Sequence, residues 1–369
     1  MKTDNVVSIY SVGDVALATI TIEKKFKLSS DVVQLFKDSD FNVFNLEFPL
    51  TFRGEKYFYD ARDEFKVKLE EINVLKEVEW NLVTLATNHI LDWGLEGILT
   101  TKETLKKFGW ISIGAGRDLI EASEPYIIDI KGIKFAFFNA CKKGRWSAND
   151  NKPGANIIDK NLIKSIKNLA YSKQVDHIIV FLHWGFEYSS YPSPEQIKFA
   201  HKLIDAGVSV ILGSHPHTLQ GFEKYKNGLI FYSQGNFIYD YKIDMQPSLE
   251  ALEKSFYTGI FNVVFAKNEI VNFNFIPLVI SENLEIKKPS KSEEKYISSF
   301  FFNISEGINN KEKFYLNVLN NIKNREKNAW LIKTYKYKSY AIFDLIKTIK
   351  LRHIKIILAS LYYSIKKYF

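Results

Sequence analysis

The sequence predicts a mixed α/β domain followed by a basic helical extension. From Val6 to about Pro277, short β-rich apolar runs alternate with helical patterns, which is typical of layered α/β folds. After residues 280–290 the chain is rich in Lys, Asn, Ser and aromatic residues without clear strands. We therefore predict a first domain over residues 1–285 and a helical extension over 286–369.

The elements of the first domain follow from these alternating patterns. Runs of β-branched and aromatic residues predict the strands Val6–Val12, Phe41–Leu46, Leu82–Ala86, Ile111–Gly114, Tyr126–Ile130, Lys134–Asn139, His177–Leu182, Val208–Leu212, Leu229–Ser233, Thr258–Phe265 and Ile270–Pro277. Helical patterns between them predict the helices Ser30–Lys37, Leu69–Glu79, Gly94–Lys107, Asn161–Ser172 and Ser193–Ala206. The last two strands form a hairpin with Asn268 in its turn.

The helix Ser193–Ala206 has residues typical of a helix start and a helix end, and the extension contains two further predicted helices. Ser193 followed by Pro194 begins the last helix of the first domain, and Gly207 closes it. In the extension, helical patterns cover Ser292–Ser305 and Lys311–Lys327.

Composition and the chain start exclude several classes of protein. The chain has 369 residues, of which 46% are hydrophobic and 25% charged, so it is too apolar to be disordered. Cys141 is the single cysteine and excludes an intramolecular disulfide. Met1–Asn5 is polar, and Asp14 follows the short apolar run after it, so we expect neither a signal peptide nor a transmembrane helix. We expect a cytoplasmic protein, at most peripheral on the inner membrane face.

The positive charge belongs to the extension. Residues 287–369 carry 18 basic and 6 acidic residues, whereas residues 1–286 carry 32 basic and 36 acidic ones. The net charge of +8 is therefore no evidence for a nucleic-acid-binding domain, and the sequence holds no RNP, zinc-finger or helix-turn-helix pattern. We expect no specific nucleic-acid partner.

Polar residues cluster directly after the predicted strands, where open α/β sheets bind ligands. Four of the seven histidines lie at these strand ends, together with two carboxylates and an asparagine. Imidazole and carboxylate groups without thiolates suit Zn, Mn, Fe or Ni. The residues concerned are Asp14, Glu47, Asn88, His89, His183, His215 and His217.

The motifs that hold these residues resemble those of the CapA family. The matching strings are GD at 13–14, NLEFPLT at 45–51, ATNHILDWG at 86–94, GAGRD at 114–118, LHWGFEY at 182–188, AGVSVILGSHPHTLQGFE at 206–223 and YSQGNFIYD at 232–240. The family comprises poly-γ-glutamate capsule synthesis proteins and belongs to the calcineurin-like metallophosphoesterase superfamily. The resemblance covers about residues 6–280.

The resemblance implies a fold and a metal site. The fold is a β-sandwich flanked by helices, with one or two divalent ions, Mn, Zn or Fe, at the strand ends. The residues that match metal ligands are Asp14, Glu47, Asn88, His183, His215 and His217. His89 matches a histidine that is not a ligand, and we expect it to act as the general acid. The superfamily usually has a second ligand, a histidine, where this chain has Ala16.

Four neighbouring residues are candidates for a supporting role around the metal. Asp92 either caps the helix at Gly94 or orients a neighbour, and Trp184 either lines the pocket or lies at its rim. Asn236 is structural or orients a ligand, and Glu187 is a solvated charge or a substrate contact.

Two functions remain open from the sequence. The first is a metal-dependent hydrolase or transferase acting in the biosynthesis or modification of a capsule or other surface polymer, with a polymer or peptide substrate. The second is a non-catalytic scaffold of a membrane-associated polymer machine, whose membrane-bound synthesis proteins would be its partners. Ala16 favours the scaffold, and His89 favours the enzyme.

The end of the chain predicts contact with an anionic membrane. Residues 328–369 hold nine basic residues and the single acid Asp344, interleaved with aromatic side chains. A basic amphipathic helix from Ser339 onward would attach reversibly to an anionic leaflet.

Overall fold

The computed structural model describes residues 6–17, 25–58, 66–67, 71–239 and 255–309. The helix predicted over Lys311–Lys327 and the basic segment 328–369 lie outside the described residues. Within the described ranges, none of the helices combines the length and apolar character needed to cross a bilayer.

The first sheet is built around two central parallel strands, β1 (Val7–Ala16) and β3 (Phe41–Leu46). Its strand order is β2-β17-β16-β15-β1-β3-β4-β5, and β14 pairs with the end of β1. The remaining strands are β2 (Lys27–Leu28), β4 (Leu82–Thr84), β5 (Ile111–Ile113), β14 (Asn236–Tyr239), β15 (Tyr257–Ala266), β16 (Glu269–Ile280) and β17 (Glu285–Lys287). The antiparallel hairpin of β15 and β16 turns at Lys267 and Asn268, as predicted.

The second sheet has the order β12-β13-β11-β10-β8-β7. Its centre is parallel, and its two edge pairs are antiparallel. The strands are β7 (Tyr126–Ile130), β8 (Ile133–Cys141), β10 (His177–His183), β11 (Val210–Ser214), β12 (Phe222–Tyr225) and β13 (Gly228–Phe231). A short pair, β6 (Ala115–Gly116) with β9 (Gly154–Ala155), lies outside both sheets.

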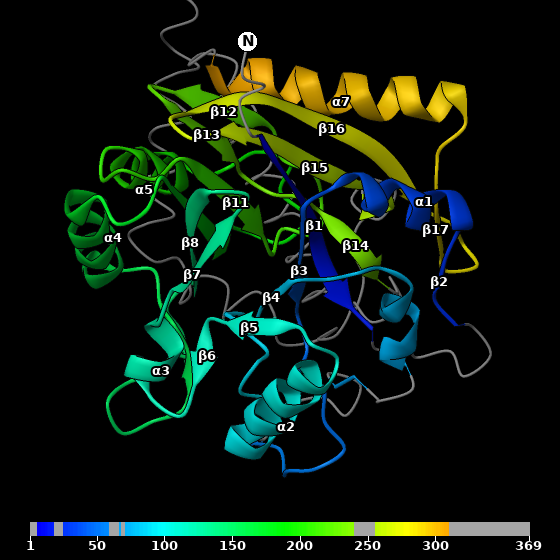
Figure 1. The fold of residues 1–369 in the computed structure, drawn as a ribbon. Helices are drawn as coiled ribbons and strands as arrows, with labels where there is room; N and C mark the ends of the chain where they lie inside the picture. The colour runs from blue at the N-terminus through cyan, green and yellow to red at the C-terminus, as the bar shows by residue number, and fades with distance from the viewer. Residues whose placement is uncertain (1–5, 18–24, 59–65, 68–70, 240–254, 310–369) are drawn as a thin grey trace, which may run out of the picture. The chain divides into compact units, whose positions relative to one another are not determined.

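The two sheets pack face to face over an aromatic-rich core. Phe41 of the first sheet stacks on Phe137 of the second, with ring centroids 5.0 Å apart. Ile178 and Val180 alternate with the core residues of β10 and are also buried. Figure 1 shows α4 (Lys160–Ser172) and α5 (Pro194–Ile204) beside the second sheet, on the side away from the first sheet. The sandwich of two sheets flanked by helices is therefore confirmed.

The helices largely follow the predicted ranges. They are α1 (Ser30–Leu35), α2 (Gly94–Lys107), α3 (Leu119–Ser123), α4 (Lys160–Ser172), α5 (Pro194–Ile204) and α7 (Lys291–Asn309). The helix predicted over Leu69–Glu79 is a 3-10 helix, η2 (Glu71–Glu77), and α1 runs into the 3-10 turn η1 (Phe36–Asp38). Asp118 caps α3, a short helix that sequence periodicity did not reveal.

Strand β1 is longer than predicted and carries the first functional residue inside it. We expected the strand to end at Val12, because Gly13 and Asp14 interrupt the apolar run. The structure instead pairs Asp14 with Asn236 and Ala16 with Tyr239, so β14 extends the sheet there. A local bulge between Asp14 and Val15 accommodates this second partner.

The compact unit extends beyond residue 285, where the sequence placed the end of the first domain. β17 pairs with β16 and β2, and α7 packs on β12 and β16. Ile297 and Phe301 of α7 belong to the core between the sheets, which explains why the unit reaches Asn309. In Figure 1, α7 lies along the outside of β16.

We predict that the capping box of α5 contributes measurably to stability. The Ser193 hydroxyl accepts a hydrogen bond from the Gln196 backbone N–H, and Gln196 Oε1 accepts one from the Ser193 N–H. Ser193→Ala should lower the free energy of unfolding by about 1 kcal/mol, measured by urea denaturation. Ser193→Asp keeps a capping oxygen and should retain most of that stability. Equal stability of the alanine variant and the wild type would contradict this role.

Candidate metal centre

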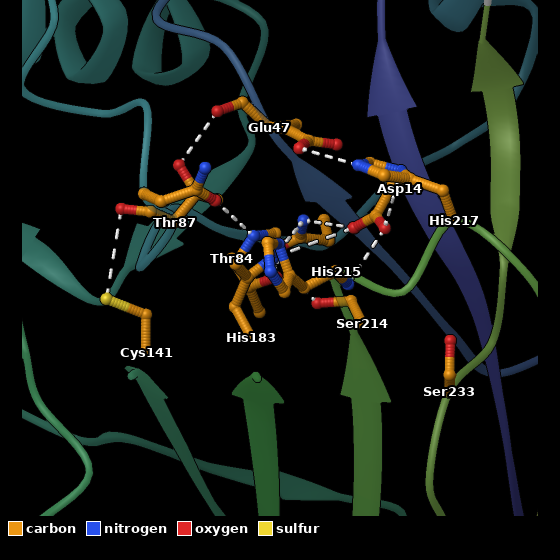
Figure 2. Close-up of polar contacts among 12 residues, drawn as sticks. Asp14, Glu47, Thr84, Thr87, Cys141, His183, Ser214, His215, His217 and Ser233 are labelled. Carbon is orange, nitrogen blue, oxygen red and sulfur yellow. Dashed lines mark hydrogen bonds and ion pairs between the residues drawn. The ribbon is translucent and has the colours of Figure 1, made fainter. Parts of the chain in front are cut away.

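The predicted site residues meet at one end of the sandwich, and both sheets supply them. Asp14 lies in β1, Glu47 directly follows β3, and Asn88 and His89 follow β4. His183 ends β10 in the other sheet. His215 and His217 follow β11. Figure 2 shows the side chains of Asp14, Glu47, His183, His215 and His217 turned toward one another at this seam between the sheets.

Asp14 is fully buried and is held by hydrogen bonds to both carboxylate oxygens. Oδ1 accepts a bond of 2.8 Å from the Asn45 side-chain amide, and Oδ2 accepts one of 2.9 Å from the His215 backbone N–H. His217 Nδ1 lies 3.5 Å from Oδ2, and His183 Nδ1 lies 3.8 Å from Oδ1. The carboxylate therefore connects residues of both sheets.

Gly13 allows the close backbone contact that fixes Asp14. The Asp14 N–H donates to the Gly235 carbonyl over 2.9 Å. A Cβ atom at residue 13 would lie 2.0 Å from that same carbonyl oxygen, so no larger residue fits without a backbone shift. The loop containing Gly235 thereby places Asn236 beside β1.

Glu47 and His217 form a buried ion pair. Glu47 Oε1 lies 3.3 Å from His217 Nε2, and His217 Nδ1 lies 2.9 Å from the Asn236 amide oxygen. Both ring nitrogens thus face acceptors, which is the arrangement of a protonated imidazole. The Glu47 Oε2 atom is buried without a hydrogen-bond partner.

His215 and His217 are directed to the same place by an unusual backbone. Both residues have left-handed φ angles, 94° and 56°, on either side of Pro216. Their nitrogens and a Glu47 oxygen lie within 4.8 Å of one another, which is close enough for one ion to contact all three. His215 Nδ1 is buried and has no hydrogen-bond partner.

Burial and charge set the protonation of this cluster. Burial tends to raise the pKa of Glu47, but the charge and hydrogen bond of His217 outweigh it and lower that pKa to about 2. Burial tends to lower the pKa of His217, and the pull of Glu47 and Asp14 instead raises it to about 10. Burial, followed by repulsion from Glu47, raises the pKa of Asp14 to about 7.

The other two imidazoles are neutral. Burial and the neighbouring His217 charge lower the pKa of His215 to about 4, and burial lowers the pKa of His183 well below its usual range. A neutral imidazole is the form that binds a metal ion.

His183 and Asn88 contact each other directly. His183 Nε2 lies 2.7 Å from the Asn88 amide oxygen, so Nε2 carries the proton, and Nδ1 accepts from the Ser214 hydroxyl at 3.0 Å. Both ring nitrogens of His183 are therefore engaged. If His183 or Asn88 binds a metal ion, this hydrogen bond must open.

His89 lies at the edge of the cluster and is oriented by Asp92. Its Nδ1 is 2.8 Å from Asp92 Oδ2, and its side chain is 20% exposed, whereas that of Asp92 is 4% exposed. Asp92 makes no side-chain cap for α2, so orientation of His89, rather than capping, is its observed role. The edge of His89 also packs against the ring of Phe48.

The remaining candidates differ in their relation to the cluster. Asn236 is fully buried and fixes His217, as its side-chain amide also donates to the His217 carbonyl. Glu187 is exposed, yet its charge raises the pKa of His217. Trp184 is directed into the interior rather than toward a rim. It is 3% exposed, and its indole N–H donates to the Tyr232 carbonyl.

Three residues that were not among the predicted site residues contact the side chains of the cluster. Asn45 bonds to Asp14 and also accepts from Thr84, and Ser214 bonds to His183. The Tyr239 ring packs 4.8 Å from that of His217. Asn45 and Ser214 each lie within two residues of a predicted ligand in the quoted motifs, which is the one signal that could have found them.

The two-sheet sandwich flanked by helices, with histidine and carboxylate side chains converging at one end, agrees with the fold and site that the motifs implied. The family model "Bacterial capsule synthesis protein PGA_cap" matches residues 8–241. The chain belongs to this family.

Two curated relatives agree with this membership. The chain is 31% identical over 244 residues to the capsule biosynthesis protein CapA of Bacillus anthracis, covering 62% of this chain and 59% of that protein. It is 30% identical over 246 residues to the PGA biosynthesis protein CapA of Bacillus subtilis, covering 64% of each. The matched part thus spans about three fifths of the length of these relatives.

Solved structures give more distant matches. The calcineurin-like phosphoesterase YfkN of Bacillus subtilis is 13% identical, covering 83% of this chain and 100% of that one, with a TM-score of 0.44. The NAD nucleotidase of Haemophilus influenzae is 16% identical, covering 82% of this chain and 63% of that one, with a TM-score of 0.47. Both TM-scores lie below 0.5.

We predict that Gly13→Ala disrupts the cluster from outside it. The added methyl group must displace β1 or the Gly235 loop, which should cost about 1–3 kcal/mol of stability and move Asp14. Metal content after reconstitution, together with urea denaturation, measures both effects. Gly132→Ala is a control for metal content: a Cβ there would have no neighbour within 4 Å, and its φ of 83° strains alanine, so this variant should lose stability but keep its metal. A Gly13 variant with wild-type stability and metal content would refute the close-contact role.

Proposed function

We propose that this protein is a metal-dependent hydrolase or transferase that acts in the assembly or modification of a poly-γ-glutamate-type surface polymer. One observation carries the proposal: a buried set of carboxylates and imidazoles converges at the seam, with the partly exposed His89 held beside it by Asp92. The two CapA relatives, which are named for capsule and PGA biosynthesis, support the polymer context.

The side chains of the cluster fit a divalent transition metal. Glu47 Oε2 and His215 Nδ1 are buried without partners, and an ion would satisfy such atoms. Asp14 and Glu47 place two carboxylates in the interior, where the proton on His217 supplies positive charge that a cation could replace. Nitrogen and oxygen donors suit Mn, Zn or Fe.

The ligands would come from both sheets. Glu47, His215 and His217 would hold the ion, with Asp14 close by and His183 and Asn88 available once their mutual hydrogen bond opens. Such an ion polarises a carbonyl or phosphoryl oxygen and lowers the pKa of bound water. Ala16 offers no ligand atom, so any second ion would have fewer donors than the superfamily resemblance implies.

His89 would transfer a proton to or from the reacting groups of the substrate. Its Nδ1–H donates to Asp92, so Nε2 is the ring nitrogen that would give a proton to a leaving group or take one from a nucleophile. Asp92 fixes both the tautomer and the ring orientation, as a carboxylate behind a catalytic histidine commonly does. This arrangement serves ester, phosphoester and amide cleavage alike.

A scaffold function is the second candidate, and Ala16 favours it. The side chain at this position is buried beside β14 and supplies no donor. In that case the metal would stabilise the seam between the sheets, and membrane-bound polymer synthesis proteins would be the partners. His89 and Asp92 would then be dispensable.

We predict that purified protein binds a divalent transition metal through the two histidines after β11. His215→Ala and His217→Ala should each weaken metal affinity by roughly tenfold or more, measured by elemental analysis and titration with Mn or Zn. His201→Ala is the matched control, because this histidine of α5 pairs with Glu223 of β12 and is not part of the metal cluster. Wild-type protein that cannot be loaded with metal would overturn the site.

We predict that His89→Ala lowers turnover by about 10²–10⁴-fold while metal content stays close to wild type. Turnover is measured on a panel of phosphoester, ester and γ-glutamyl substrates, with Asp92→Asn expected to give an intermediate loss. Loss of metal together with activity would make His89 a ligand. Metal-loaded wild type without turnover on the panel, combined with normal polymer formation in cells carrying His89→Ala, would establish the scaffold function instead.

A further inference from the structure

Three loops meet around the metal cluster. We call them the rim loops: residues 52–58, 142–152 and 185–188. The Lys142 N–H donates to the carbonyl of His183, and the Tyr57 N–H donates to the carbonyl of Asp92. The Tyr188 N–H donates to the carbonyl of Pro216, between the two histidines after β11. Each rim loop is thus anchored within the site itself.

Cation–π contacts join the rim loops to one another. Lys142 Nζ lies 5.0 Å from the ring centre of Phe186, and Arg145 Cζ lies 4.2 Å from that of Phe58. Lys152 Nζ lies 5.8 Å from the ring centre of Tyr57 and also donates to the Arg145 carbonyl. Loop 142–152 therefore supplies the cations, and the other two rim loops supply the aromatic faces.

The charge of the rim loops is opposite to that of the surrounding domain. They contain six basic residues and three acidic ones, whereas residues 1–286 carry a net charge of −4. Lys142 and Arg145 are exposed, and the side chains of Tyr57 and Phe186 are 47% and 42% exposed. The rim loops, over these three residue ranges, are thus positive and aromatic, while the buried Asp14 and Glu47 are acidic.

We infer that Lys142, Arg145 and Lys152 form a subsite that binds the carboxylates of an acidic polymer while one of its linkages lies at the metal cluster. This inference rests on the proposed function and adds to it the residues that select the substrate. Arg145 and Lys152 lie over the neighbouring rings of Phe58 and Tyr57, and Lys142 lies over Phe186 on another loop.

This arrangement suits charges that recur along a chain. A single phosphate is usually held by donors that converge on one point, such as backbone N–H groups at a helix start. Here the three cations of loop 142–152 lie over three separate rings, two on loop 52–58 and one on loop 185–188. The planar guanidinium of Arg145 matches a carboxylate with two parallel hydrogen bonds. The exposed aromatic faces can pack against the methylene groups between successive carboxylates.

Lysine labelling of the full-length protein tests where the polymer binds. The probe is a γ-linked glutamate decamer, and the neutral γ-linked glutamine decamer and inorganic phosphate are the comparisons. We expect the glutamate decamer to protect Lys142 and Lys152 from acetylation, read peptide by peptide by mass spectrometry. Lys224, which lies 5.2 Å from the ring centre of Phe273 on β16, is the matched internal control and should stay unprotected. Equal labelling of Lys142 and Lys152 with and without the decamer would overturn the subsite.

Substitution gives an independent measurement. The combined Lys142→Gln, Arg145→Gln and Lys152→Gln variant should bind the glutamate decamer about tenfold more weakly at low salt, because each exposed charge contributes modestly. Lys224→Gln should change affinity less than about twofold. Unchanged affinity of the triple variant would contradict the inference. Displacement of the decamer by inorganic phosphate at equal concentration would also contradict it, because the subsite would then be a phosphate site.

Failure of this inference is distinguishable from failure of the proposed function. Both measurements are repeated with metal removed by EDTA, and metal content of the triple variant is determined. Protection of Lys142 and Lys152 in the metal-free protein would support the subsite even if no turnover is found. If the triple variant binds the decamer as tightly as the wild type and has normal metal content, the subsite is rejected and the proposed metal centre is unaffected.

Discussion

Asp14 is an ionisable group without access to water, and the surrounding architecture satisfies it from three separate parts of the chain. Asn45 and the His215 backbone bond to its two oxygens, and the Gly235 carbonyl bonds to its backbone N–H. A buried carboxylate without such partners would cost several kcal/mol. The strands that pair with β1 on either side place residues next to Asp14: β3 carries Asn45, and β14 carries Asn236.

The histidines also depend on compensating partners in the interior. Glu47 adds a second interior carboxylate, and the positive charge of His217 compensates the pair. His217 in turn depends on Asn236 for its orientation, and its left-handed backbone is fixed next to Pro216. A chain of hydrogen bonds thus runs from the sheet to the loops, and the removal of one member leaves another buried polar group without its partner.

The sequence was informative wherever a local pattern decides the structure. Runs of β-branched and aromatic residues predicted β3 and β7 with their observed ends, and Ser193 with Pro194 predicted the start of α5. Strand β14 could not be recognised, because Asn236–Tyr239 follows Gly235 in a motif that reads as a loop, and only its pairing with β1 makes it a strand. The end of the unit was placed too early since the core contacts of α7 are tertiary and leave no local signal.

The sequence predicted which site residues lie near one another, but it did not predict all of their side-chain contacts. Their positions at strand ends indicated that Asp14, Glu47 and the histidines lie close together, because the carboxyl ends of strands meet at one edge. It could not show that His183 is hydrogen-bonded to Asn88, or that Trp184 turns inward to the Tyr232 carbonyl. Those contacts depend on side-chain directions, which a linear spacing does not specify.

The division of the ligand residues between the two sheets has a consequence for the order of assembly. Glu47 follows a strand of one sheet, and His215 and His217 follow a strand of the other. A newly made chain in which the sheets have not yet docked offers each ion only part of this ligand set. Tight binding of the proposed ion would therefore come late and report completed folding, and a partly folded chain would be a poor competitor for the ion.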